Sequence, residues 1–152
     1  MLAEKALESV PTDVHASPES VRTLNLSGNA LRSLAGLSAY SNLETLVLDK
    51  NGLASLPECP ALPSVRTLWF NTNAVEDMVE FLGEVVAAFP RLSFLSMMNN
   101  PASPSLVCMS EEDIKAQERH RLYVIYRVPT LEFLDAGPVS AEERASARER
   151  GR

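Results

Sequence analysis

Asparagine is the residue type with the most regular spacing along this chain of 152 residues. Four asparagines each follow a similar apolar segment: Asn29, Asn51, Asn73 and Asn100. A side-chain amide carries two donors and an acceptor, so a buried asparagine can bind backbone groups that no regular strand or helix satisfies. We therefore predict a structural role for these four residues, in which each amide holds a turn of the backbone.

Residues suited to catalysis or metal binding are scarce in this sequence. The histidines are His15 and His120, the cysteines are Cys59 and Cys108, and their spacing matches no zinc site. The chain has no glycine-rich phosphate loop and no serine or cysteine in a nucleophile motif. We expect free thiols, no metal, no cofactor, no small-molecule substrate and no enzymatic activity.

The four asparagines belong to an internal repeat. Its eleven-residue copies begin at Val21, Leu43, Val65 and Leu92, so they are 22 to 27 residues apart. Each copy is apolar at its first, fourth and sixth positions and has asparagine at its ninth, which is the pattern of leucine-rich repeats. The alternation of apolar residues predicts one short strand per copy. We predict an α/β fold, a leucine-rich repeat solenoid with a curved parallel sheet on its concave face.

The segments between the strands should return along the convex side. The third return is the longest, and its apolar residues have helical spacing from about Val75 to Phe89, just before Pro90. We predict an amphipathic helix there, packed on the core; partner binding by this helix is the alternative. The predicted apolar face comprises Met78, Phe81, Leu82, Val85, Val86 and Phe89.

Both ends of a solenoid must be closed, and the sequence predicts how this happens. Residues 1–139 should form a single domain, with an N-terminal half-repeat (1–20), four repeats (21–105) and a cap (106–139). The half-repeat should cover the open edge of the first strand, which would otherwise pair with another chain. A charged helix or tail should occupy residues 140–152.

The predicted cap combines a helix with a last strand. The helix should end before Pro129, and residues 131–135 form a strand-like half-repeat. Four residues of the helix should face the last repeat: Leu122, Ile125, Tyr126 and Val128. Ser140 and Glu143 match a capping box that starts the final, arginine-rich helix. That helix is either solvated or a contact for an acidic partner surface.

The candidate partner-binding residues lie on the concave face. The third, fifth and seventh residues of each copy should point out of the core. Among them, the large apolar groups gather around Trp69, and tryptophan is the residue type most enriched in binding hot spots. The first strand is polar there. The alternatives are that the N-terminal residues cover Trp69 or that Trp69 is an exposed residue without a binding role. The predicted partner-binding set is Val47, Asp49, Trp69, Asn71, Phe94 and Met98.

The C-terminal segment resembles a known family. Residues 120–144 are similar to the C-terminal cap of the short intracellular leucine-rich repeat proteins. The run that begins at Asn100 and Pro101 is most similar to the melanocyte-associated branch, followed by the axonemal dynein light chains and the spliceosomal A-prime proteins. His120 replaces a usual tyrosine of the cap, and Met97 replaces a leucine.

The resemblance implies a non-catalytic adaptor or assembly subunit that binds a protein partner. It leaves several roles open: a subunit of an axonemal, ciliary or other large complex, a trafficking adaptor linked to a small GTPase, or a subunit of a ribonucleoprotein particle.

Charge and hydropathy limit the remaining classes. The net charge is -6 and the sequence pI is about 5.0, which argues against a general nucleic-acid binder. No apolar run approaches the roughly 18 residues that indicate a membrane span. The first residues lack an apolar signal core, so we expect a cytoplasmic protein, with a cilium, axoneme or other cytoskeletal assembly as a more specific location.

Overall fold

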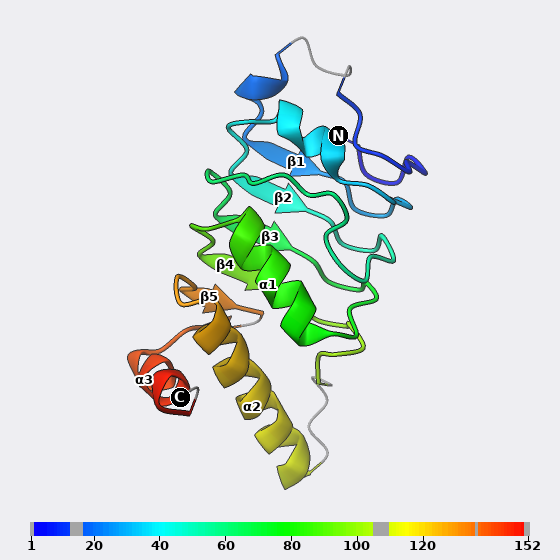
Figure 1. Cartoon of the computed structure of the whole chain (residues 1–152). Helices are drawn as coiled ribbons and strands as arrows, with labels where there is room; N and C mark the ends of the chain where they lie inside the picture. Colours follow the sequence, from blue (N-terminus) through cyan, green and yellow to red (C-terminus); the bar gives the residue numbers. More distant parts are fainter. Residues whose placement is uncertain (1, 13–16, 105–109, 136, 151–152) are drawn as a thin grey trace.

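The computed structural model describes residues 2–12, 17–104, 110–135 and 137–150. Over these residues the chain forms one sheet whose six strands follow the sequence order (Figure 1). The strands are β1 (Thr23–Asn25), β2 (Thr45–Val47), β3 (Thr67–Trp69), β4 (Phe94–Ser96), β5 (Phe133–Leu134) and β6 (Gly137–Pro138). The first five pair in parallel, and β6 pairs with β5 in antiparallel orientation. The predicted solenoid with a parallel sheet is confirmed.

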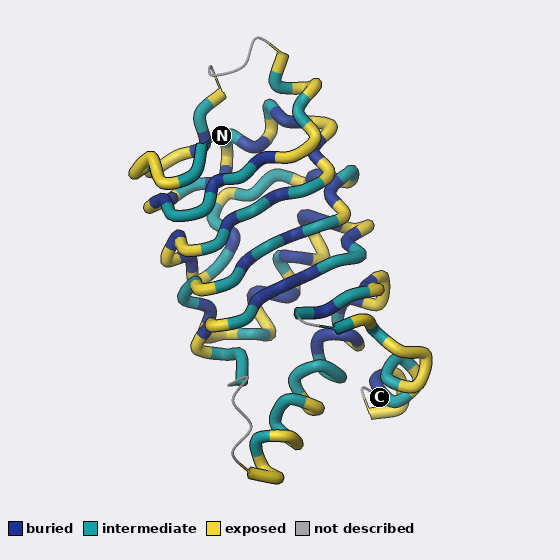
Figure 2. Tube along the Cα trace, turned by 180° about the vertical axis from the view of Figure 1, so that it is seen from behind, coloured by how far each residue is buried: buried dark blue, intermediate teal, exposed yellow. Residues whose placement is uncertain are grey.

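The register of the strands places equivalent repeat positions side by side. The fourth residue of each copy therefore lies in one buried row that crosses the sheet: Leu24, Leu46, Leu68, Leu95 and Leu134. Burial of one leucine side chain stabilises a fold by roughly 1.5–3 kcal/mol. Figure 2 shows the buried segments stacked along the sheet, so each repeat completes the core of its neighbour.

Each asparagine of the repeat binds both its own turn and the preceding repeat. The Nδ2 atom of Asn51 donates to the carbonyl oxygens of Leu48 and Leu26, both at 3.0 Å, and its Oδ1 accepts from the N–H of Leu31 at 3.3 Å. The same arrangement recurs at Asn73 and Asn100, and at Asn29 with the N-terminal segment. These amides form a hydrogen-bonded ladder along the solenoid.

The residue before each of these asparagines has a left-handed backbone. The φ angles are +70° at Gly28, +57° at Lys50, +55° at Thr72 and +59° at Asn99. Only the first of the four is glycine, and a residue with a Cβ in this region costs roughly 1–2 kcal/mol. The bonds of the neighbouring asparagine offset that cost, because they hold the turn in place.

Helix α1 (Met78–Ala88) covers one face of the sheet over β3 and β4 (Figure 1). It begins three residues later than predicted, because the Asp77 side chain accepts the N–H of Glu80 at 3.0 Å and caps the helix there. Its buried residues are Phe81, Leu82, Val85 and Ala88. Val86, predicted on the apolar face, is 40% exposed. Of two short 3-10 turns, η1 (Pro18–Ser20) precedes β1 and η2 (Ala35–Ala39) lies in the return between β1 and β2.

The cap contains helix α2 (Glu111–Arg127), which ends before Pro129 as predicted. The helix begins at the charged residues from Glu111, since the Ser110 side chain accepts the N–H of Asp113 at 3.3 Å and forms the N-cap. Val124, Ile125 and Val128 are buried against the last repeats. Tyr126 was expected on the same face, but it is 42% exposed.

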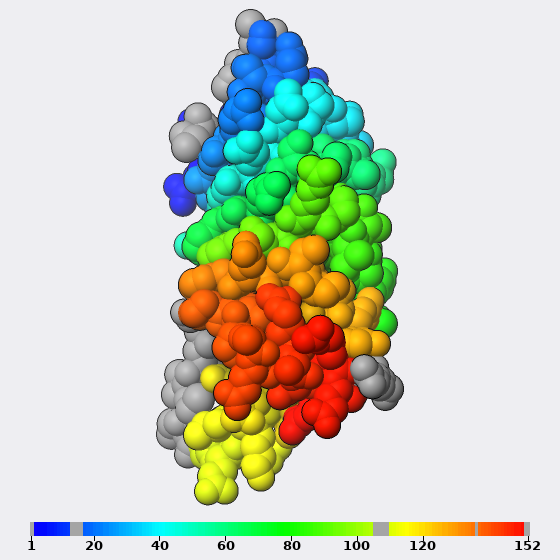
Figure 3. All heavy atoms as spheres, turned by 90° about the vertical axis from the view of Figure 1, so that its left-hand side faces the viewer, coloured from blue at the N-terminus to red at the C-terminus, as the bar shows by residue number. Residues whose placement is uncertain are grey.

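Helix α3 (Ala141–Arg150) starts with the predicted capping box. The Glu143 N–H donates to Ser140 Oγ at 3.0 Å, and the Ser140 N–H donates to Glu143 Oε1 at 3.1 Å. The Glu143 carboxylate also accepts two bonds from the Arg121 guanidinium of α2, and Ala147 is buried. Figure 3 shows the red end of the chain lying against the residues that precede it. This helix is therefore packed on the cap.

The half-repeat was predicted to cover the edge of β1, but the described N-terminal residues pair with the turn and return that follow β1. The Ala30 N–H donates to Leu7 O at 2.8 Å, and Ser9 forms a parallel bridge with Ser33. The N-terminal segment packs beside this turn because the Asn29 side chain hydrogen-bonds to its backbone and because Val10 is buried in the core. Among the described residues, β1 remains the edge strand of the sheet.

Candidate protein-binding surface

A row of three aromatic rings crosses the concave face on neighbouring strands. The ring centroids of Trp69 and Phe94 are 4.8 Å apart, and those of Phe94 and Phe133 are 5.0 Å apart. The second pair is stacked, with an interplanar angle of 13°. All three side chains are partly exposed. Stacked rings that remain open to solvent form a rigid apolar surface.

Phe133 belongs to this row but was not among the predicted partner-binding residues. It is the third residue of the half-repeat that begins at Leu131, and it pairs in register with Phe94. The rule that the third residue of a copy points outward also applies to this half-repeat. The sequence signal was therefore present, in the segment assigned to the cap.

Val47 and Met98 extend the surface on either side of the row. Val47 pairs with Trp69 in the register of β2 and β3, and it is partly exposed. Met98, at the seventh position of the fourth copy, lines a cavity at the cap. The structure thus brings the four predicted apolar residues to one face, although Met98 lies near its end.

The two polar residues of the predicted set hold neighbouring repeats together. Asp49 Oδ1 accepts the N–H of Asn71 at 2.7 Å, and Asn71 Oδ1 accepts the N–H of Met98 at 2.7 Å. Asn71 Oδ1 also accepts the hydroxyl of Ser96 at 2.8 Å. Ser96 was expected to point outward, but it is fully buried, because its small side chain lies below these larger neighbours.

Burial changes the acidity of Asp49. Desolvation raises the pKa of its carboxyl group above 3.8, whereas the hydrogen bonds from Asn71 and the charge of Lys50 act in the opposite direction. The carboxylate form is therefore less favourable in the folded chain than in water.

The polar end of the concave face carries an ion pair. Arg22 Nη1 lies 2.6 Å from Glu44 Oε2, between the first two repeats, and both side chains are about half or more exposed. Such a pair contributes only about 0–1 kcal/mol to stability. Together with the exposed residues Lys50 and Arg66, it gives the apolar row a charged rim.

Groups for metal or nucleophilic chemistry are not brought together in the described part of the chain. No cluster of three or more histidine, cysteine, aspartate or glutamate residues is placed there to hold a metal ion. Cys59 is a free thiol, and burial raises its pKa to about 12, so it stays protonated and unreactive. Cys108 and His15 lie outside the described residues. None of the described helices has the length and apolar character needed to span a membrane.

A parallel sheet of one strand per repeat, with an asparagine ladder behind it, defines a leucine-rich repeat protein. The chain belongs to the leucine-rich repeat family, whose family model matches residues 8–152. The Leucine-rich melanocyte differentiation-associated protein of Homo sapiens is 40% identical to it over 131 residues, which is 84% of this chain. The chain spans 66% of the length of that relative. The resemblance to the melanocyte-associated branch is confirmed.

A solved structure also matches this chain. It is the crystal structure of the Drosophila melanogaster SNF/U2A' complex, with a TM-score of 0.45 and 22% sequence identity. The match covers 84% of this chain and 77% of the chain in that structure.

Proposed function

We propose that this protein is a non-catalytic interaction module that binds a protein partner on its concave face, centred on Trp69. The aromatic row of Trp69, Phe94 and Phe133 carries this proposal. Its rings are already ordered by one another, so these side chains lose little conformational entropy when a partner covers them. Membership of the leucine-rich repeat family supports the proposal, because such solenoids present extended concave surfaces for binding.

The surface has the composition of a binding centre with a polar rim. Val47, Trp69 and the two phenylalanines supply apolar area, and the Arg22–Glu44 pair lies at the polar end. Aromatic residues at the centre of an interface commonly dominate its binding energy, whereas charged residues at the rim contribute less. We therefore place the hot spot at Trp69.

The proposed role is that of an adaptor or assembly subunit. The similarity to a protein named for its association with melanocyte differentiation makes melanocytes the first cells in which to search for the partner. A ribonucleoprotein role is the second candidate from the sequence resemblance. It predicts binding of RNA by the purified chain with an affinity that falls as salt rises.

The test compares wild-type protein with the Trp69→Ala variant. Proteins captured from a melanocyte lysate by the wild type only are purified and titrated by calorimetry against both forms. We expect the substitution to weaken binding by about 2 kcal/mol or more, roughly 30-fold. Thr23→Ala, on the polar end of the same face, is the control and should bind like the wild type.

Melting curves of both variants decide how a loss of binding is interpreted. A loss without a comparable fall in melting temperature supports the interface. Equal binding by wild type and Trp69→Ala would move the interface to α1 or the arginine-rich C-terminal helix. Parallel losses of binding and melting temperature would show that Trp69 is packed structure.

A further inference from the structure

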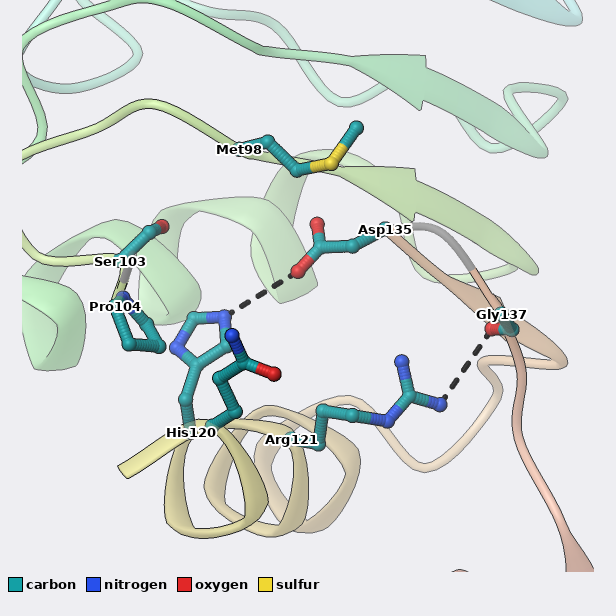
Figure 4. A pocket seen from close by; sticks show the side chains of 8 residues that line it. Met98, Ser103, Pro104, His120, Arg121, Asp135 and Gly137 are labelled. Carbon is teal, nitrogen blue, oxygen red and sulfur yellow. Dashed lines mark hydrogen bonds and ion pairs between the residues drawn. The ribbon is translucent and has the colours of Figure 1, made fainter. Parts of the chain in front are cut away.

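A cavity of about 180 Å³ lies where the concave face meets the cap (Figure 4). Its walls come from the end of the fourth repeat, from α2, and from the corner between β5 and β6. The lining residues are Met98, Ser103, Pro104, Gln117, His120, Arg121, Asp135 and Gly137. A water molecule occupies about 30 Å³ of liquid, so this space is large enough for a side chain.

Two buried side chains contact one another at the wall of this cavity. The side chains of His120 and Asp135 are 8% and 12% exposed, and His120 Nε2 lies 3.5 Å from Asp135 Oδ2. Nε2 is buried and has no hydrogen-bond partner. At 3.5 Å this contact is longer than a normal hydrogen bond, so Asp135 Oδ2 keeps the capacity to accept a donor from the cavity.

The other polar groups around the pair already have partners. Asp135 Oδ1 accepts the N–H of Met97 at 2.8 Å, and Ser103 Oγ donates to Met97 O at 2.7 Å. The Arg121 guanidinium donates to Leu134 O and to both carboxylate oxygens of Glu143. These contacts leave Asp135 Oδ2 as the acceptor that a ligand in the cavity can use, because His120 Nε2 is buried.

Charge and shape define the donor that fits. Glu143 offsets the charge of Arg121, so the Asp135 carboxylate is left as the charge that a ligand would meet. Met98 and Pro104 give the cavity an apolar wall, against which an aliphatic stem can pack. The net charge of -6 also attracts cations to the chain. An ammonium group on an aliphatic stem fits the free carboxylate, the apolar wall and the negative charge of the chain.

We propose that this cavity binds a lysine side chain of the protein partner, with the ammonium group at Asp135 Oδ2, beside the His120 ring. The proposal rests on the proposed function, because Met98 joins the cavity to the concave binding face. It adds a second anchor, of different chemistry, to the apolar hot spot at Trp69.

The test uses a small probe of the same chemistry and needs no partner. The ¹⁵N-labelled full chain is titrated with n-butylammonium chloride near pH 7.5, and amide and imidazole resonances are followed by NMR. We expect saturating chemical-shift changes at His120, Met98 and Asp135, with a dissociation constant of roughly 10 mM for so small a ligand. n-Butanol, which has the same stem without the charge, should cause no comparable shifts.

A pair of matched variants locates the effect. Asp135→Asn keeps an oxygen for the Met97 N–H and tolerates the positive φ of +55° at this position, so the fold should persist. It should weaken n-butylammonium binding about tenfold. Glu142→Gln, which removes an equal charge from an exposed site on α3, should leave the affinity unchanged.

Three results would overturn the proposal: no saturating shift up to about 100 mM probe, equal shifts with n-butanol, or unchanged affinity in Asp135→Asn. The comparison of the two probes uses wild-type protein and does not depend on the stability of a variant. Since Trp69 takes no part in the titration, failure here leaves the concave-face proposal standing. Failure of the Trp69→Ala test would likewise leave a positive titration intact.

Discussion

The indole ring of Trp69 contacts the ring of Phe94 at a centroid distance of 4.8 Å and an interplanar angle of 43°. The two residues are diagonal rather than opposite, because the register of β3 and β4 pairs Trp69 with Ser96 and Phe94 with Thr67. Diagonal neighbours on a sheet are within reach only of long or aromatic side chains. The contact therefore depends on the ring size of both partners, and it orders Trp69 before any partner binds.

A double-mutant cycle measures this contact. We expect Trp69→Ala and Phe94→Ala, singly and together, to give a coupling of about 0.5–1.5 kcal/mol in the free energy of unfolding by urea. Thr23→Ala combined with Phe94→Ala is the control, and these distant substitutions should be additive. Additivity of the aromatic pair would show that the rings touch without stabilising one another.

The asparagine ladder leads to a prediction about stability. In Asn51→Leu, the backbone groups of Leu26, Leu31 and Leu48 lose a common partner while they remain buried. We expect a loss of roughly 2–4 kcal/mol in the free energy of unfolding. Asn42→Ala, at an exposed position, should cost far less. An unchanged urea midpoint in Asn51→Leu would contradict a stabilising role for the ladder.

The sequence predicted those parts of the fold that follow from a repeated pattern. Leu46 and Leu68 share a position in their copies, so their burial and the parallel register between them follow from the spacing alone. Helix α1 was also predictable, although its start depended on Asp77, a cap that the apolar spacing does not contain. Periodicity reports which face is buried and says less about where an element begins.

The features that the sequence did not reveal depend on contacts between distant segments. His120 and Asp135 meet because α2 packs beside β5, and no local pattern places those two side chains together. The burial of Ser96 likewise depends on its larger neighbours in the adjacent repeat. The alternation of apolar and polar residues along a strand predicts which way a side chain points. It does not predict how deeply neighbouring side chains bury it.

Glu143 should make the stability of the chain depend on pH. The side-chain hydrogen bonds from Arg121 hold the pKa of this carboxyl group below its ordinary value of 4.5, although burial acts against them. A depressed pKa in the folded state stabilises the fold above pH 4.5, and this contribution is lost as pH falls through the folded value.

Glu143→Gln tests that dependence. Its melting temperature should lie below that of the wild type at pH 7, and the difference should narrow as the pH falls toward 3, because protonation then removes the same charge from the wild type. Glu142→Gln, on the same helix but exposed, should follow the wild type across the range. A constant difference at every pH would mean that shape, and not charge, accounts for the loss.

Asp49 should have the opposite effect on stability. Burial raises the pKa of its carboxyl group, so the folded chain binds the proton more tightly than the unfolded chain does. Stability then falls as pH rises through the ordinary pKa toward the folded value, and at neutral pH the whole cost is present. In the next repeat, Asn71 occupies the same position without a charge and makes equivalent bonds through its Oδ1.

The exchange Asp49→Asn should therefore raise the melting temperature at pH 7. The amide oxygen can still accept the N–H of Asn71, now 2.7 Å from Asp49 Oδ1, while the buried charge is gone. The advantage should shrink as the pH falls toward 3, where the wild-type carboxyl group is protonated. The reverse substitution, Asn71→Asp, places a carboxylate at the equivalent site and should lower the melting temperature at pH 7. A lower melting temperature for Asp49→Asn at pH 7 would show that the charged form binds the Asn71 N–H strongly enough to outweigh its burial.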